Sequence, residues 1–487
     1  MAAHAMNLLK PMACSRRGTS GVLSVFILVG AFLSAVFVID PFLGVILGVG
    51  LLGMVLAVEP RNRLPLVVLG WMATFGYSAE LSAVKFAFIG FCVVVAGLST
   101  LECYRFSAGT PRGFIRAAMT VAGAIGVVCL LAWVVGVIGG ANPVDASRDS
   151  AAYLLFAVTI PVAVEAGLVL RRQTLVRLIV ACGLLSALSF FVTNTSARGV
   201  NQFSAFTPWL GSLLLAIPVA SMAFARAVYS RGLSRALWWS CFLFVTGLVL
   251  ASGTRTGLIL LAPAAVVSVV PATHHARRST AIALLMASIA GIYVSLVTVF
   301  SRLVDPDFIA KRLGFLVDFS IDAFVADRSA QLRVERYYRA LSYFKGQPVL
   351  GKGFGTITAY ERLDETQAVS FYLDTPLLVP AKFGIVGTVA LAVCVFVLAH
   401  VSLGWCSHNE VSVDQLAILG FMAGTVAALP LSAVLEDKGY VLGLCLVLAL
   451  GISVRPKNEG CENKVLRPNK MDAARRVRER RPWTTAK

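Results

Sequence analysis

Stretches of about 20 predominantly apolar residues recur from end to end of the chain, and a helix of that length crosses the hydrocarbon core of a bilayer. Of the 487 residues, 58% are apolar and only 14% are charged. Soluble domains carry about 45–50% apolar and about 25% charged residues. The composition excludes a soluble enzyme, a disordered protein and a disulfide scaffold. We therefore expect an all-α, polytopic transmembrane helix bundle.

The apolar stretches predict about 12–14 spans, which divide the chain into four regions. These are a transmembrane bundle of about eleven spans (1–300), a large, partly helical periplasmic loop (301–375), C-terminal transmembrane helices (376–454) and a basic tail (455–487). The expected spans are 21–39, 42–58, 64–79, 83–100, 117–139, 152–170, 178–193, 207–227, 236–252, 257–272, 281–300, 376–402, 415–433 and 439–454.

Basic residues cluster in alternate short loops, a pattern that fixes orientation through the excess of Lys and Arg on the cytoplasmic side. Arg61 and Arg63, Arg171 and Arg172, and the C-terminal tail fall on one side. The sequence thus predicts a multi-pass protein of the bacterial inner (cytoplasmic) membrane with both termini in the cytoplasm. The net charge of +18 follows this distribution, which indicates contact with membrane lipids rather than nucleic acid.

Cysteine and histidine residues are absent from the predicted outward loops. The ten Cys fall within spans or in cytoplasmic segments, and the five His lie on or near the cytoplasmic side. No external disulfide and no external His/Cys metal site are expected. No metal and no cofactor are predicted.

The long outward loop contains a predicted amphipathic helix, Arg328–Lys345. Val334, Tyr337, Leu341 and Phe344 recur at helical spacing and form one apolar stripe. Arg333, Arg336 and Arg339 lie on a neighbouring face. The following segment, Gly351-Lys352-Gly353-Phe354-Gly355, lacks the spacing of a nucleotide-binding loop. Two interpretations of it stay open: a flexible turn, or a backbone that approaches a phosphate.

Two further arginines lie outside the membrane in this topology. Arg198 follows the seventh span, in a segment that also holds Asn201, and Arg255 lies in a tight turn between the ninth and tenth spans. An arginine at such a position contacts lipid headgroups or binds an anion. With the basic loop on the same side, both residues favour an outward-facing cationic pocket suited to a diphosphate.

At these positions the chain resembles the bacterial O-antigen ligase and polymerase family of membrane glycosyltransferases. The resemblance covers roughly residues 190–400. It is carried by Ser252–Gly257, by Arg333 through Gly355 with Pro348 and Gly351-x-Gly353-x-Gly355, and by Asp374 through Gly387.

The resemblance implies a metal-independent, inverting enzyme. Such an enzyme transfers an oligosaccharide from a polyprenyl diphosphate to an acceptor hydroxyl on the periplasmic side, for O-antigen or exopolysaccharide synthesis. It places Arg198 and Arg255 at the diphosphate and matches Arg333 to the loop arginine. Arg336, Lys352 and Asn201 are further expected substrate contacts, and a chain-length regulator protein is a candidate partner.

One departure from the family pattern bears on the acceptor. Ligases of the family usually carry a His-Asn pair where this chain has Leu373-Asp374-Thr375. The difference favours a polymerase and makes Asp374 the candidate base, with Glu335, Asp327 and Asp364 as fallbacks. Ligation to a lipid or protein acceptor remains an alternative.

A transporter or flippase for lipid-linked sugars is the alternative from another class. Transporters place charged side chains within their spans. In this chain Glu165 is the clear intraspan acid, and Lys382 lies near the outer end of its span.

Overall fold

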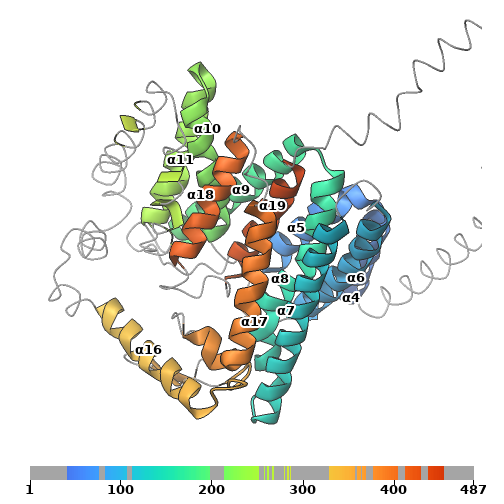
Figure 1. Cartoon of the computed structure of the whole chain (residues 1–487), viewed down its shortest axis with the longest axis vertical. Helices are drawn as coiled ribbons and strands as arrows, with labels where there is room; N and C mark the ends of the chain where they lie inside the picture. Colours follow the sequence, from blue (N-terminus) through green and yellow to red (C-terminus); the bar gives the residue numbers. More distant parts are fainter. Residues whose placement is uncertain are drawn as a thin grey trace, which may run out of the picture.

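The computed structural model describes residues 41–75, 83–106, 112–197, 213–251, 328–356, 359–362, 365–368, 377–403, 412–428 and 437–454, with a few helical residues between 257 and 286. Nearly all of them are helical (Figure 1). The membrane bundle consists of α4 (Pro41–Ala57), α5 (Pro60–Phe75), α6 (Ala83–Phe106), α7 (Arg112–Ile138), α8 (Pro143–Val169), α9 (Arg172–Ala197), the 3₁₀ turn η1 (Leu213–Ala216), α10 (Ile217–Tyr229), α11 (Gly232–Ala251), α17 (Leu378–Leu403), α18 (Val413–Ala428) and α19 (Lys438–Ser453).

Six of these helices, α6, α7, α8, α9, α11 and α17, are long and apolar enough to cross a membrane. Residues 213–229, α18 and α19 form shorter apolar helices. The predicted all-α polytopic membrane fold is therefore confirmed. The predicted spans 21–39 and, almost entirely, 281–300 lie outside the described residues, so the total of 12–14 stays a prediction.

The predicted outward loop contains helix α16 (Arg328–Gly346), which matches the expected helix Arg328–Lys345. The loop also contains one element that the sequence did not predict, an antiparallel pair of strands, β1 (Ala359–Arg362) and β2 (Glu365–Ala368). The expected apolar stripe of α16 is only partly covered, because Val334 and Tyr337 are 41% and 44% exposed. The helix instead buries Ala340 against Leu378 and Ala381 of α17.

The centre of the bundle is α8, whose apolar segment is 78% buried. It packs against α5, α6, α7 and α19. Asn142 caps its first turn by accepting a hydrogen bond from the Val144 N–H at 2.9 Å. A β-carbon at Gly167 would lie 2.5 Å from Cβ of Ile452, so the absence of a side chain there lets α8 and α19 approach closely.

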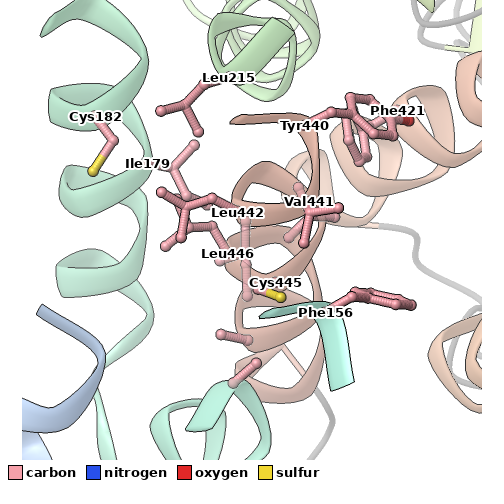
Figure 2. Close-up of a cluster of buried hydrophobic side chains, with 14 of the residues drawn as sticks. Phe156, Ile179, Cys182, Leu215, Phe421, Tyr440, Val441, Leu442, Cys445 and Leu446 are labelled. Carbon is pink, nitrogen blue, oxygen red and sulfur yellow. The ribbon is translucent and has the colours of Figure 1, made fainter. Parts of the chain in front are cut away.

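The second central helix, α19, is surrounded by buried side chains from four other elements (Figure 2). Leu442, Cys445 and Leu446 of α19 are at most 1% exposed. The labelled neighbours are Phe156 of α8, Ile179 and Cys182 of α9, Leu215 of η1 and Phe421 of α18. The Tyr440 hydroxyl bonds the Thr425 hydroxyl of α18, which satisfies two polar groups inside this apolar cluster.

Helix α16 lies at one end of the bundle, beside the first turns of α17 (Figure 1). The last turns of α7 and the first turns of α6, α8 and α17 lie at the same end. We call this the α16 end, and the other the opposite end. The predicted functional residues are connected to the α16 end.

Candidate active site at the α16 end of the bundle

The residues predicted to form the site divide into two groups. Arg198, Asn201, Arg255 and Asp374 lie outside the described residues. Arg333 and Arg336 lie on α16, and Lys352 lies in the turn that follows it. The Nζ of Lys352 lies 5.0 Å from the ring centroid of Tyr343, a cation–π distance. The structure brings α16 and this turn together but does not test the roles of these residues.

Arg198, Arg255 and Asp374 follow or precede helices that have one end at the α16 end of the bundle. Arg198 directly follows Ala197, the last residue of α9, and Arg255 comes four residues after the end of α11. Both helices start at the opposite end, because each follows a short connection from a helix that ends there. Asp374 comes four residues before α17, which starts beside α16.

The segment after α16, residues 347–355, is a turn that we call the glycine turn; its first four residues are exposed, whereas residues 351–355 are mostly buried. The backbone N–H groups of residues 351–355 all donate within the protein. Their acceptors are the carbonyl oxygens of Gln347 (2.9 Å), Ala381 (2.8 Å), Lys382 (3.0 Å) and Ala132 (3.0 Å) and, for Gly355, Oδ2 of Asp149 (3.1 Å). Both sequence interpretations of this turn are therefore wrong. It is not flexible, and its N–H groups are already used and do not cradle a phosphate.

Glycine is required where the turn crosses α7. Gly353 has φ of +78°, and a β-carbon there would lie 2.1 Å from the backbone nitrogen of Gly136. The next residue, Phe354, is fully buried and lies edge-on to Phe383 of α17, with ring centroids 5.1 Å apart. The ring of Tyr153 of α8 lies 5.7 Å from the same ring. The turn is thereby packed between the membrane helices α7, α8 and α17.

A buried carboxylate joins these helices beneath the turn. Oδ1 of Asp149 in α8 accepts a hydrogen bond from Nζ of Lys382 in α17 at 2.5 Å, and both side chains are at most 4% exposed. Oδ2 of Asp149 accepts the bond from Gly355. A buried charge is tolerated when it is paired and hydrogen-bonded, so Asp149 holds the turn while Lys382 balances its charge.

Further basic side chains interact electrostatically around Lys438, on which Asp149 also acts. Lys85 of α6 is 2% exposed, Arg148 of α8 is half-buried, and both act electrostatically on Lys438 at the start of α19. The carboxylates that act on Lys438 are Asp149 and Asp437. We call Lys85, Arg148, Lys382 and Lys438 the cationic cluster. Among the residues that the structure describes, this cluster sets four basic groups against the acidic groups of Asp149 and Asp437.

The sequence analysis did not single out Lys85, Arg148 or Lys438 as site residues. The sequence feature that could have indicated a role for Lys85 and Lys438 was their position at the ends of apolar runs. Lys85 lies near the start of one run, and Lys438 precedes another. A basic residue at a span end is more often a headgroup contact. Only the packing of α6, α8 and α19 shows that these three lie near one another.

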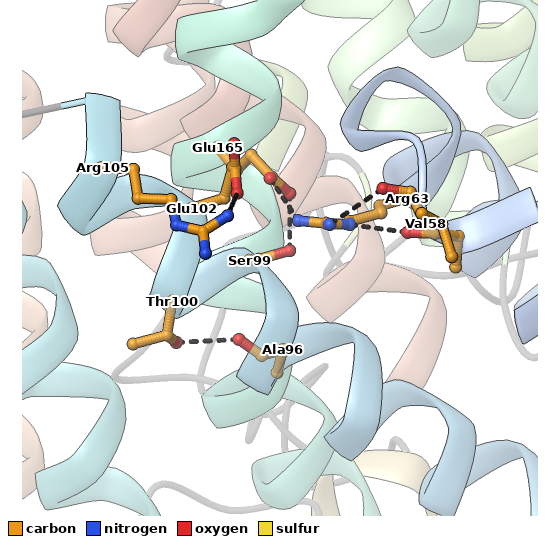
Figure 3. Close-up of polar contacts among 9 residues, drawn as sticks. Val58, Arg63, Ala96, Ser99, Thr100, Glu102, Arg105 and Glu165 are labelled. Carbon is orange, nitrogen blue, oxygen red and sulfur yellow. Dashed lines mark hydrogen bonds and ion pairs between the residues drawn. The ribbon is translucent and has the colours of Figure 1, made fainter. Parts of the chain in front are cut away.

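Two networks of buried charged groups at the opposite end hold helices together. Glu165 of α8 accepts hydrogen bonds from Arg63 of α5 and, at 2.6 Å, from the Ser99 hydroxyl of α6 (Figure 3). Arg63 also donates to the Ala57 carbonyl at 2.8 Å. Glu165, the acid that raised the transporter alternative, is therefore fixed in a structural ion pair.

A second network at this end joins α9, α10 and α18. Asp414 of α18 accepts from Arg172 of α9 and, at 2.9 Å, from Arg226 of α10. Asp414 is fully buried. Both networks join helices to one another.

One known protein family matches part of the chain. Residues 239–392 match the family model described as O-antigen ligase. The predicted resemblance is confirmed. No curated protein matches the chain.

The O-antigen ligase match covers most of the predicted site. Arg255, Arg333, Arg336, Lys352 and Asp374 lie within it. Arg198 and Asn201 precede it, as do Lys85 and Arg148 of the cationic cluster. The match and the apolar helices together support a membrane enzyme of O-antigen-related glycosyl transfer that acts on a lipid-linked oligosaccharide.

Proposed function

We propose that this protein polymerises oligosaccharide repeats, transferring them from a polyprenyl-diphosphate carrier at the periplasmic face of the inner membrane. The observation that carries the glycosyl transfer is the O-antigen ligase match over residues 239–392, and the choice of polymerisation rests on the Leu373-Asp374-Thr375 segment. The α16 end is then the periplasmic end, which agrees with the basic loops predicted for the cytoplasmic side.

The proposed chemistry is a single displacement with inversion. The acceptor hydroxyl attacks the anomeric carbon of the donor sugar, a new glycosidic bond forms, and the bond from that carbon to the diphosphate oxygen breaks. The bonding electrons leave with the diphosphate. Asp374, our candidate base, takes the proton of the acceptor hydroxyl.

The departing diphosphate needs its charge neutralised in the transition state. Preorganised basic groups provide this through charge-assisted hydrogen bonds. Arg198 and Arg255 are the proposed bidentate ligands. Lys85, Arg148 and Lys438 add positive charge at the same end of the bundle. With this many cations, we propose that the reaction needs no divalent metal.

Two acceptors remain to be distinguished. The Leu373-Asp374-Thr375 segment favours polymerisation, in which the acceptor is another lipid-linked repeat. The description of the matched family favours ligation, in which the acceptor is a different molecule.

Surface polysaccharide from a deletion strain tests the proposal. A polymerase defect leaves single repeats, whereas a ligase defect leaves full-length chains that are not attached to their acceptor. Unchanged polysaccharide would contradict both. Movement of a lipid-linked sugar across reconstituted vesicles without a new glycosidic bond would instead indicate a flippase.

A further inference from the structure

The glycine turn contacts the membrane helices well inside their ends. It bonds α7 at Ala132, six residues before that helix ends, and α8 at Asp149, six residues after that helix starts. Its bonds to α17 run from Ala381 to Val386, three to eight residues after that helix starts. At 1.5 Å per residue, the contacts lie about 5–12 Å inside the helix ends. The turn thus lies inside the ends of three separate helices.

Residues 351–355 meet the condition that such a depth imposes on the backbone. Non-helical backbone is tolerated at membrane depth only where its polar groups are satisfied within the protein. The N–H groups of residues 351–355 all donate within the protein, and the turn exchanges hydrogen bonds with α17. Ile385 N–H donates to Pro348 O at 2.8 Å, while Lys352 N–H donates to Ala381 O at 2.8 Å.

A break in α17 makes this exchange possible. Gly384 has φ of 63° and ψ of −172°, so the helical hydrogen bonds across it are interrupted. The N–H groups of Ile385 and Val386 and the carbonyls of Ala381 and Lys382 are then free to bond the turn. A β-carbon at Gly384 would lie 2.2 Å from Val349 O, so the backbones meet where there is no side chain.

Two apolar side chains of the turn face outward. Val349 and Leu350 are 60% and 57% exposed. They continue an exposed apolar surface of α17, where Val386 and Val389 are 58% and 56% exposed. Val386 is joined directly to the turn, because its N–H donates to the Val349 carbonyl at 3.3 Å. An outward apolar face on a membrane-length helix contacts lipid.

We propose that residues 347–355 form a re-entrant membrane segment whose Val349 and Leu350 side chains contact the acyl chains of the leaflet at the α16 end. The occupant of this surface is the lipid bilayer. Helix α16 then lies along the membrane interface, where exposed Tyr337 and Tyr338 suit the headgroup level. Five basic residues against one acidic residue in α16 match anionic headgroups.

Site-directed spin labelling of the full-length chain in liposomes tests this placement. Val349→Cys and Leu350→Cys are labelled with a nitroxide, and collision with oxygen is compared with collision with a water-soluble nickel complex. We expect both labels to collide more often with oxygen than with the nickel complex, as a label at the lipid-facing reference position, Val389→Cys, should. The water-facing reference is Glu335→Cys on α16, whose side chain is 54% exposed. The labelled but unsubstituted chain corrects for native thiols.

Two outcomes overturn the proposal. If labels at residues 349 and 350 collide with the nickel complex as often, relative to oxygen, as a label at Glu335→Cys does, the turn lies in water. Low collision with both reagents would mean that protein covers the patch. A second measurement places a tryptophan at this position, as Leu350→Trp, in liposomes of brominated lipid. The fluorescence that the new tryptophan adds to that of the unsubstituted chain should be quenched by the bromine atoms. If this added fluorescence is not quenched, the proposal is also overturned.

Discussion

Asp149 and Lys382 are 233 residues apart in the chain, yet the Asp149 carboxylate and the Lys382 ammonium group meet at 2.5 Å inside the bundle. Because Asp149 also accepts the Gly355 N–H, one carboxylate connects α8, α17 and the glycine turn. The ion pair therefore links the membrane bundle to the segment that carries α16.

The two partners of this pair should not be equally sensitive to substitution. Removing one member of a buried ion pair costs about 3–5 kcal/mol. Asp149→Asn leaves Lys382 among the other basic residues of the cationic cluster, so we expect the full cost. Lys382→Met leaves Asp149 with Lys438, on which it acts electrostatically, so we expect a smaller loss. Thermal unfolding of the purified protein in nanodiscs measures both.

The double variant Asp149→Asn/Lys382→Met provides the control for this comparison. Its loss should be less than the sum of the single losses, since neither charge is left unpaired. Equal stability of Asp149→Asn and the unsubstituted protein would contradict the buried bridge.

The glycine turn should not accept a side chain at Gly353. In Gly353→Ala the new β-carbon would lie 2.1–2.5 Å from backbone atoms of α7. The φ of +78° is also unfavourable for alanine, so the turn must move away from α7. We expect a marked loss of thermal stability and of polysaccharide synthesis. Gly123→Ala in α7 is the matched control, because nothing lies within 4 Å of its β-carbon and alanine favours helix by about 1 kcal/mol. A Gly353→Ala protein as stable as the control would show that the turn does not pack as described.

Hydropathy predicts the helices well and their ends poorly. The predicted span 117–139 corresponds to α7, Arg112–Ile138, and the predicted span 178–193 to α9, Arg172–Ala197. Each helix starts several residues earlier than predicted, at an arginine, because hydropathy marks the apolar part whereas the helix continues into the interface. Helix α16 was predicted nearly to the residue, since Gly346 and Pro348 mark its end.

The site residues stay a prediction from the sequence. Arginines in the predicted outward segments indicate one end of the protein, but pairing between helices leaves no trace in one sequence. Nothing near Asp149 indicates Lys382 as its partner, and Lys85 resembles an ordinary residue at a span end. The role of the glycine turn was also hidden, because its spacing does not reveal that Asp149 and α17 take its N–H groups.

The cationic cluster gives a prediction about activity. Lys85→Gln and Arg148→Gln each remove a charge that we place near the leaving diphosphate. We expect the transfer rate to fall by about 10²-fold, the usual cost of one preorganised stabilising group. The measurement is polymer formation from a purified lipid-linked repeat. Arg105→Gln is the control, because Arg105 is exposed and pairs with Glu102 at the opposite end. Wild-type rates in both cluster variants would remove the cluster from the mechanism.

Arg198 and Arg255 should be needed for chain elongation and not for membrane insertion. Arg198→Ala and Arg255→Ala should abolish long polymer while the protein stays in the membrane at normal abundance. Arg255→Lys should restore little activity, because an ammonium group lacks the planar fork that binds a diphosphate through two hydrogen bonds. Polymer length on gels of surface polysaccharide, with immunoblots of membranes, measures both effects. Normal chain length in both alanine variants would show that the diphosphate is held elsewhere, and a fully active Arg255→Lys would show that charge alone suffices.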